Sequence, residues 1–271
     1  MSVRVERELQ PSGGEVAVVT LDDPGRRNIL SPEMVESLVG ATAELARDTS
    51  VAAVVVTGAG PAFCGGAPLS SLVDASGQAR DGGGAEAALR SIYAAFEAVA
   101  RLPMPTIAAV NGPAVGAGTN LALACDVRVA ARSARFDSRF LALGLHPGGA
   151  HTWALSRLAG PSAARAMVLL GEVVGGDEAE RIGLVWRSVD DDELLGHALE
   201  LARRAASVPA ALLRRAKETF ARTEPVATRA EATDVELEAQ LWSLADPGLS
   251  ALLSEAARAR AHRPPPGTAG T

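Results

Sequence analysis

One stretch of the sequence constrains the fold of this chain more than any other, the segment TIAAVNGPAVGAGTNLALACD from Thr106 to Asp126. It starts as a short apolar run typical of a buried strand, and it turns at Asn111-Gly112-Pro113. The small residues Gly116-Ala117-Gly118 then lead into an apolar, helix-like run. The first N–H groups of a helix lack intrahelical acceptors, and small side chains let a ligand approach them closely. The segment therefore predicts either ordinary strand–turn–helix packing or a site for a negatively charged atom.

Strand and helix patterns alternate along the first part of the chain, and only helical patterns follow. Strand-like runs cover residues 3–9, 15–21, 51–57, 106–110, 126–130 and 184–189. Helices are predicted for residues 32–47, 85–101, 117–124 and 162–170, and then for residues 191–206, 209–222, 227–244 and 248–261. This order predicts an α/β core over residues 1–190 and a helical region over residues 191–271.

Two segments have the composition of irregular structure. Residues 75–84, ASGQARDGGG, are polar and rich in glycine, which predicts a mobile surface loop; a lid and a disordered segment are open alternatives. The tail HRPPPGTAGT, residues 262–271, is rich in proline and is predicted to be frayed.

The composition argues against several classes of protein. The net charge of −6 over 271 residues disfavours a nucleic-acid surface. No run of about 18 apolar residues could span a membrane, and the N-terminus lacks an apolar signal region. Cys64 and Cys125 lie among small apolar residues and favour a reducing compartment, so the chain is expected in the cytoplasm. Lys217 is the only lysine, which excludes a P-loop.

Several chemical motifs are absent or incomplete. In GAGTNL, Leu121 occupies the third glycine position of a dinucleotide fingerprint, and the sequence has no G-x-S-x-G elbow. His146 and His151 have no acidic residue between them, and the cysteines are far away in sequence, so no metal site is expected.

Two small-residue loops remain, and each follows a buried strand. One contains Gly65-Gly66-Ala67 and the other contains Gly116-Ala117-Gly118. Two such loops side by side can direct two backbone N–H groups at one oxygen atom, which makes an oxyanion hole. One such donor is typically worth about 3–4 kcal/mol of transition-state stabilisation.

Five segments in the same order resemble the crotonase, or enoyl-CoA hydratase/isomerase, superfamily. The two loops, FCGGAPL (63–69) and AVNGPAVGAGTNLALACD (109–126), carry the resemblance most specifically. Residues 24–30, 143–160 and 171–189 also resemble family segments, and the likeness spans about residues 3–260. The resemblance implies a spiral of ββα repeats followed by a C-terminal helical trimerisation region, with a homotrimer or a dimer of trimers as the assembly.

The resemblance also implies a ligand and a set of residues that bind it. Family members bind acyl-CoA thioesters, hold the thioester carbonyl between two backbone N–H groups and stabilise an enolate. The matching donors are Ala67 and Ala117. Coenzyme A enters as part of the substrate, and no other cofactor is implied. Substrate contacts are expected from Arg26, Arg27, Ile29, Gly65, Pro68, Leu69, Ser70, Gly116 and Phe140, with the two arginines as candidates for the CoA phosphates.

The chain departs from the family pattern where hydratases carry their two glutamates. Asn120 and Phe140 stand at these positions, and Pro68 replaces the acidic residue usual after the first oxyanion alanine. An amide and a phenyl ring cannot act as the acid and the base, so ordinary hydratase activity is not expected. The titratable residue nominated in their place is His146, because histidine titrates near neutral pH. Asp74, Asp137 and His151 are weaker candidates.

Three functional hypotheses follow from these residues. The first is an enzyme of fatty acid metabolism, an isomerase or lyase that forms an enolate of an acyl-CoA, with Asn120 hydrogen-bonded to the acyl group or to water. The second is a non-catalytic acyl-CoA binding protein on the same fold. The third is a hydratase whose water is held by other residues.

Overall fold

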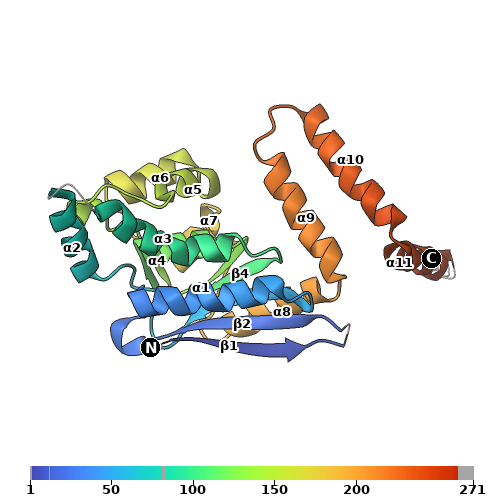
Figure 1. Ribbon diagram of the computed structural model, residues 1–271, viewed down its shortest axis with the longest axis horizontal. Coiled ribbons are helices and arrows are strands. Elements are labelled where there is room, and N and C mark those ends of the chain that lie inside the picture. The colour runs from blue at the N-terminus through green and yellow to red at the C-terminus, as the bar shows by residue number, and fades with distance from the viewer. Residues whose placement is uncertain (1, 12, 81–83, 262–271) are drawn as a thin grey trace, which may run out of the picture. The chain divides into compact units, whose positions relative to one another are not determined.

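The computed structural model describes residues 2–11, 13–80 and 84–261 (Figure 1). The chain forms two compact units, one up to Ala210 and one from Ala211 onward.

Within the described residues, the first unit is built on a six-stranded sheet in the order β1-β2-β3-β4-β6-β9. The strands are β1 (Ser2–Leu9), β2 (Glu15–Asp22), β3 (Val51–Gly58), β4 (Thr106–Val110), β6 (Val127–Ala131) and β9 (Arg187–Val189). β1 and β2 form an antiparallel pair, and the other neighbours are parallel. The continuous apolar runs of β3 and β4 explain their central place, because strands of a parallel sheet are covered on both faces.

The predicted strand at residues 184–189 is too long. Only Arg187–Val189 pair with β6, whereas Leu184 and Val185 are buried in the preceding turn. The carbonyl of Leu184 accepts a hydrogen bond from Nε of the buried Arg128 at 2.7 Å. These two residues are buried by tertiary contacts. In the sequence, a run of apolar residues looks the same whether it is buried in a turn or in a strand.

A second, smaller sheet holds the site, and the sequence did not predict most of it. In the described part of the chain it has three strands, β5 (Pro113–Val115), β7 (Arg135–Asp137) and β8 (Val174–Gly175). β5 pairs with β7 in parallel, and β7 pairs with β8 in the antiparallel direction. Strands of two or three residues are too short to show an alternating pattern in the sequence. They can be recognised only from the strands with which they pair.

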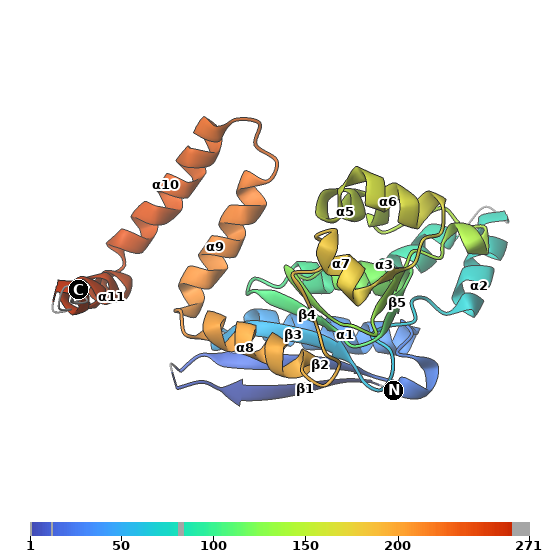
Figure 2. The same ribbon diagram turned by 180° about the vertical axis from the view of Figure 1, so that it is seen from behind.

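Helices cover both faces of the large sheet (Figures 1 and 2). α1 (Pro32–Arg47) begins at Ser31, whose hydroxyl accepts from the Met34 N–H at 3.3 Å, and it packs against α3 (Ala85–Ala100). α8 (Leu194–Ala206) packs against β2, β3, β4 and β6. The first compact unit thus includes α8 and extends to Ala210, whereas the sequence pattern changes at residue 190.

The prediction of a loop over residues 75–84 is wrong for most of that segment. Helix α2 (Leu69–Arg80) covers residues 75–80, and Gly84 caps α3; residues 81–83 lie outside the described residues. α2 packs against α3 and buries Ala75, whereas a Cβ added at Gly77 would meet no atom within 4 Å. Tertiary packing therefore overrides the low helix propensity of this segment.

The remaining short helices lie between strands. They are η1 (Pro24–Arg26), α4 (Ala117–Leu123), η2 (Leu141–Leu143), α5 (His151–Leu158), α6 (Gly160–Leu169) and α7 (Gly176–Arg181). Of these, α4 and α7 lead from the small sheet back to the large one. None of the helices in the described segments is both long and apolar enough to cross a bilayer.

The second unit consists, within the described residues, of α9 (Ala210–Thr223), α10 (Arg229–Ala245) and α11 (Pro247–Ala261), as the sequence predicts. Thr228 and Glu231 form a capping box at the start of α10, and Glu238 of α10 pairs with Arg215 and Arg222 of α9 at 2.9 and 2.6 Å. No described residue of α9 or α10 is buried. The predicted frayed tail, residues 262–271, lies outside the described residues.

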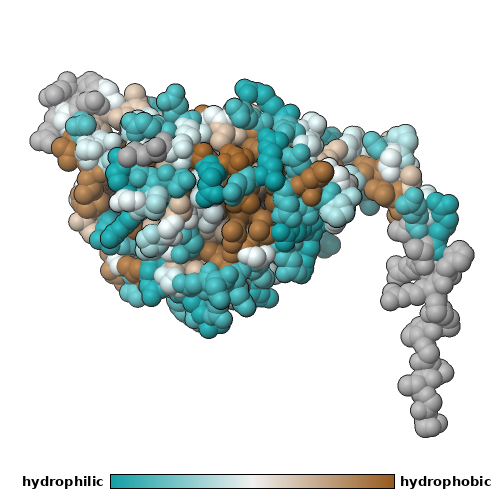
Figure 3. Space-filling view, turned by 90° about the horizontal axis from the view of Figure 1, so that it is seen from below, coloured by the Kyte–Doolittle hydropathy of each residue, from teal (hydrophilic) through white to brown (hydrophobic). Residues whose placement is uncertain are grey.

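Large apolar side chains are exposed on both units. They include Leu169, Leu170 and Trp186 in the first unit, and Phe220, Leu237, Leu241, Leu244 and Leu253 in the second. Figure 3 shows one face of the molecule, on which apolar patches lie among polar residues.

Candidate active site

The two small-residue loops of the sequence meet in the structure. The N–H of Val115 donates to the carbonyl of Cys64 at 3.0 Å, and the N–H of Cys64 donates to the carbonyl of Pro113 at 3.2 Å. Gly66 has a φ of +87°, and a Cβ at this position would overlap the carbonyl oxygen of Val115. Only glycine combines that left-handed backbone with so close an approach, so the identity of residue 66 keeps the loops in contact.

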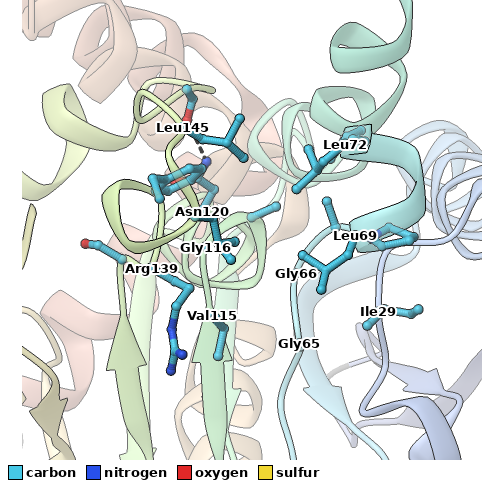
Figure 4. A pocket seen from close by; sticks show the side chains of 18 of the residues that line it. Ile29, Gly65, Gly66, Leu69, Leu72, Val115, Gly116, Asn120, Arg139 and Leu145 are labelled. Carbon is cyan, nitrogen blue, oxygen red and sulfur yellow. Dashed lines mark hydrogen bonds between the residues drawn. The ribbon is translucent and has the colours of Figure 1, made fainter. Parts of the chain in front are cut away.

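A cavity of about 680 Å³ opens between these loops. Figure 4 shows its two walls, one carrying Val115, Gly116, Asn120, Arg139 and Leu145, and the other Ile29, Gly65, Gly66, Leu69 and Leu72. Leu89, Ile92 and Tyr93 of α3 add to the lining. The lining is mostly apolar with a few convergent polar groups, as is usual for a small-molecule site.

Every residue in the predicted site lines this cavity. The set is Arg26, Arg27, Ile29, Gly65, Ala67, Pro68, Leu69, Ser70, Gly116, Ala117, Asn120, Phe140 and His146. Of the weaker candidates, Asp137 accepts a hydrogen bond from Arg139 Nε at 2.8 Å, and Asp74 is exposed on α2. Neither aspartate is part of the cavity lining, so the structure groups the main candidates and leaves these two outside.

The backbone N–H groups of Ala67 and Ala117 are available to a ligand. Ala117 is the first residue of α4, so its N–H lacks an intrahelical acceptor. Within the described residues, neither of these N–H groups donates to another protein group. The two loop segments are adjacent at this point, because a Cβ on Gly66 would lie 3.5 Å from the nitrogen of Ala117.

A buried chain of three polar side chains reaches the cavity lining at both of its ends, Asn120 and Ser138, with His151 between them. Asn120 Oδ1 lies 2.6 Å from His151 Nδ1, and His151 Nε2 lies 2.8 Å from Ser138 Oγ. The amide nitrogen of Asn120 donates to the carbonyl of Gly148 at 2.9 Å. All three side chains belong to residues that are less than 5% exposed. The sequence pointed to Asn120, but it did not link Asn120 to Ser138, and it ranked His146 above His151.

His151 is held neutral by its surroundings. Burial lowers the pKa of its imidazole to about 4, because the charged form loses its hydration. The ring also meets the ring of Phe140 edge-on, with 4.9 Å between centroids. His146, in contrast, is exposed at the cavity, and its Nδ1 lies 2.8 Å from the carbonyl of Pro147.

The turn that carries Arg26 and Arg27 is fixed to the first loop by Asn28. Its Oδ1 accepts from the N–H of Asp23 at 2.9 Å, and its Nδ2 donates to the carbonyl of Ala62 at 2.8 Å. Asn28 is fully buried with a φ of +54°, a conformation that asparagine tolerates better than most residues. The side chain of Arg26 is paired with Asp23 at 2.8 Å.

Comparison with known proteins identifies the family. A model of the enoyl-CoA hydratase/isomerase family matches residues 12–246. The chain belongs to the enoyl-CoA hydratase/isomerase family. It is 48% identical over 208 residues to a probable enoyl-CoA hydratase of Mycobacterium tuberculosis, a match that covers 77% of this chain and 78% of that protein.

Two further comparisons extend the identification. The chain is 40% identical over 195 residues to the 1,2-epoxyphenylacetyl-CoA isomerase of Escherichia coli, covering 72% of this chain and 74% of that protein. The crystal structure of an enoyl-CoA hydratase from Bacillus anthracis superposes with a TM-score of 0.82 at 31% identity, covering 94% of this chain and 97% of that one. The predicted crotonase-like α/β fold is thereby confirmed. The names of these relatives include both a hydratase and an isomerase, so membership of the family leaves the reaction open.

The neutral His151 of this family member predicts a pH dependence of stability. Its pKa is about 4 in the folded chain and near the ordinary 6.5 in the unfolded chain. Between these values the unfolded chain binds the additional proton, so the free energy of unfolding falls as the pH drops from about 6.5 to 4. At about 1.4 kcal/mol per pKa unit, the loss is about 3 kcal/mol. Urea denaturation of wild type and His151→Gln at pH 7.5 and 4.5 tests this, because the variant should lose less stability. Equal losses would contradict it.

Proposed function

We propose that this protein binds an acyl-CoA thioester in the cavity, with the carbonyl oxygen between the N–H groups of Ala67 and Ala117. The observation that supports the proposal is the meeting of the two loops at one cavity, because both N–H groups lack a protein acceptor within the described residues. Two such donors lower the energy of an enolate that forms when a bond at the adjacent carbon breaks. The proposed reactions are therefore of the isomerase or lyase type, in fatty acid metabolism.

The cavity offers different surroundings to the two ends of such a ligand. The exposed guanidinium of Arg27 can meet the phosphates of coenzyme A, together with Arg26 of the same turn. Leu72, Ile92 and Phe140 supply apolar surface for the acyl chain. Coenzyme A arrives with the substrate, and no further cofactor is proposed.

Ordinary hydratase chemistry is not proposed, because the positions matched to its glutamates carry Asn120 and Phe140. Neither side chain exchanges a proton near neutral pH. His146 is a histidine of the cavity lining and is exposed there, and we retain it as the candidate proton carrier. A non-catalytic acyl-CoA binding protein is the second candidate function, and the absence of a carboxylate among the lining residues of the described chain favours it.

One experiment separates these functions. Enoyl-CoA, 3-hydroxyacyl-CoA and malonyl-type CoA thioesters are incubated with the protein, and turnover and affinity are measured in parallel. Turnover that falls in His146→Ala supports the enzyme with His146 as proton carrier. Binding without turnover in either protein supports the binding protein. Hydration of crotonyl-CoA at ordinary hydratase rates would contradict the roles given to Asn120 and Phe140, and a failure to bind any thioester would overturn the proposal.

We propose in addition that the helical unit joins copies of the chain into a homotrimer or a dimer of trimers. Leu237 and Leu241 support this, because they lie one turn apart on α10 and are 49% and 56% exposed. The double variant Leu237→Glu/Leu241→Glu is expected to reduce the particle mass in light scattering to that of one chain, whereas Asp234→Asn on the same helix should not. A wild-type mass of one chain would contradict the assembly. The cytoplasmic location stays a prediction.

A further inference from the structure

The side chain of Asn120 is held in a single orientation. Its amide nitrogen faces the carbonyl of Gly148, which can only accept a hydrogen bond. If the amide were flipped, two oxygen atoms would face each other at 2.9 Å, and the buried pair would be repulsive. The other end of the amide, Oδ1, therefore faces His151 Nδ1 and must accept from it.

The orientation of Asn120 determines the protons on its two partners. Because Oδ1 only accepts, Nδ1 of His151 carries the hydrogen, and a neutral ring then leaves Nε2 as an acceptor. The hydroxyl of Ser138, 2.8 Å from Nε2, donates to it. Each group in the chain Ser138–His151–Asn120 thus has one role, and the ring cannot rotate without breaking both bonds.

One hydrogen of the Asn120 amide is left over. The NH₂ group has two hydrogens, and Gly148 takes one. Among the described residues no acceptor takes the other, although Asn120 is only 4% exposed. Leaving a buried donor unsatisfied is costly. Asn120 also lines the cavity, where Figure 4 shows its side chain and the hydrogen bond to Gly148 as a dashed line.

We propose that Ser138 and His151 are positioning residues, which hold Asn120 so that its second amide hydrogen binds an oxygen atom on the acyl group. This inference rests on the proposed function. Asn120 lies one turn after Ala117 on α4, so the two residues share a face of that helix, and both line the cavity. A thioester whose carbonyl is bound at the Ala117 N–H therefore has its acyl carbons beside the Asn120 amide. The ligand class is an acyl-CoA that carries an oxygen atom on its acyl chain, and the third carbon is the position tested.

The test compares two ligands that differ only in that oxygen, 3-hydroxybutyryl-CoA and butyryl-CoA. Dissociation constants are measured by calorimetry for wild type, Asn120→Leu, His151→Phe, His151→Gln and Ser138→Ala. One hydrogen bond predicts that wild type prefers the hydroxylated ligand by about tenfold. Asn120→Leu should remove the preference, and His151→Phe should reduce it with little change in butyryl-CoA binding. His151→Gln keeps an N–H that can reach Asn120 Oδ1, so this variant is expected to retain part of the preference for the hydroxylated ligand. Thermal melting identifies any variant that is unfolded.

The outcomes are distinguishable. Equal affinity of wild type for both ligands would overturn this inference and leave the proposed function standing, whereas no binding of either ligand would overturn both. An unchanged preference in folded His151→Phe and Ser138→Ala would show that these residues do not position the amide. Mass spectrometry after incubation with acyl-CoA is the last arm: an acyl group on Ser138 would make the serine a nucleophile and contradict its role here, and an unmodified chain agrees with it.

Discussion

Replacing Ala117 with proline is expected to lower kcat/KM for an acyl-CoA substrate by about 10²–10³. Proline has no backbone N–H, and losing one oxyanion donor typically costs about 3–4 kcal/mol of transition-state stabilisation. The substitution is mild in other respects, because Ala117 is the first residue of α4 and proline is well tolerated at that position. The change therefore removes the N–H of residue 117 and leaves helix α4 intact.

The matched control for this variant is Ala117→Ser, which retains the N–H at the same position and is expected to keep most of the activity. Circular dichroism and thermal melting show whether the proline variant is folded. Steady-state kinetics on the best substrate from the thioester panel provides the measurement. If a folded Ala117→Pro variant has the kcat/KM of wild type, the thioester oxygen is not held by this group. In a binding protein without turnover, the same pair of variants is compared by affinity.

Replacing Gly118 with alanine is expected to destabilise the chain by about 3 kcal/mol. A Cβ on Gly118 would overlap the carbonyl oxygen of Cys64, and it would lie 2.8 Å from the carbonyl carbon. Both atoms belong to the backbone of the first loop, so relief requires the two loops to separate, and overpacking of this kind is destabilising. The loss of stability and the loss of the cavity geometry should therefore appear together.

Gly40→Ala is the matched control. Gly40 lies in the interior of α1, is exposed, and has nothing within 4 Å of an added Cβ. The same substitution there should raise stability by up to about 1 kcal/mol, because alanine favours a helix over glycine. Urea denaturation of both variants gives the comparison. If the Gly118→Ala protein is as stable as wild type, residue 118 does not lie as close to the backbone of Cys64 as the structure shows.

Much of the fold follows from local patterns. The apolar runs of β3 and β4 and the Ser31-Pro32 start of α1 are visible in the sequence because a buried strand or a helix start depends on a few neighbouring residues. Helix α2 is the opposite case. Its polar, glycine-containing sequence predicts a loop, and its contact with α3 makes it a helix.

The candidate site likewise has parts that the sequence predicts and parts that it does not. By itself, the sequence determined the strand–turn–helix of residues 106–126 and the two glycine-rich loops, because glycine and alanine are required wherever backbones approach closely. Only the tertiary structure decided that His151 lies between Asn120 and Ser138. These residues are 31 and 13 positions from His151 along the chain. Hydrogen bonds between segments so far apart depend on how α4, α5 and the end of β7 pack together, and no local pattern in the sequence records that packing.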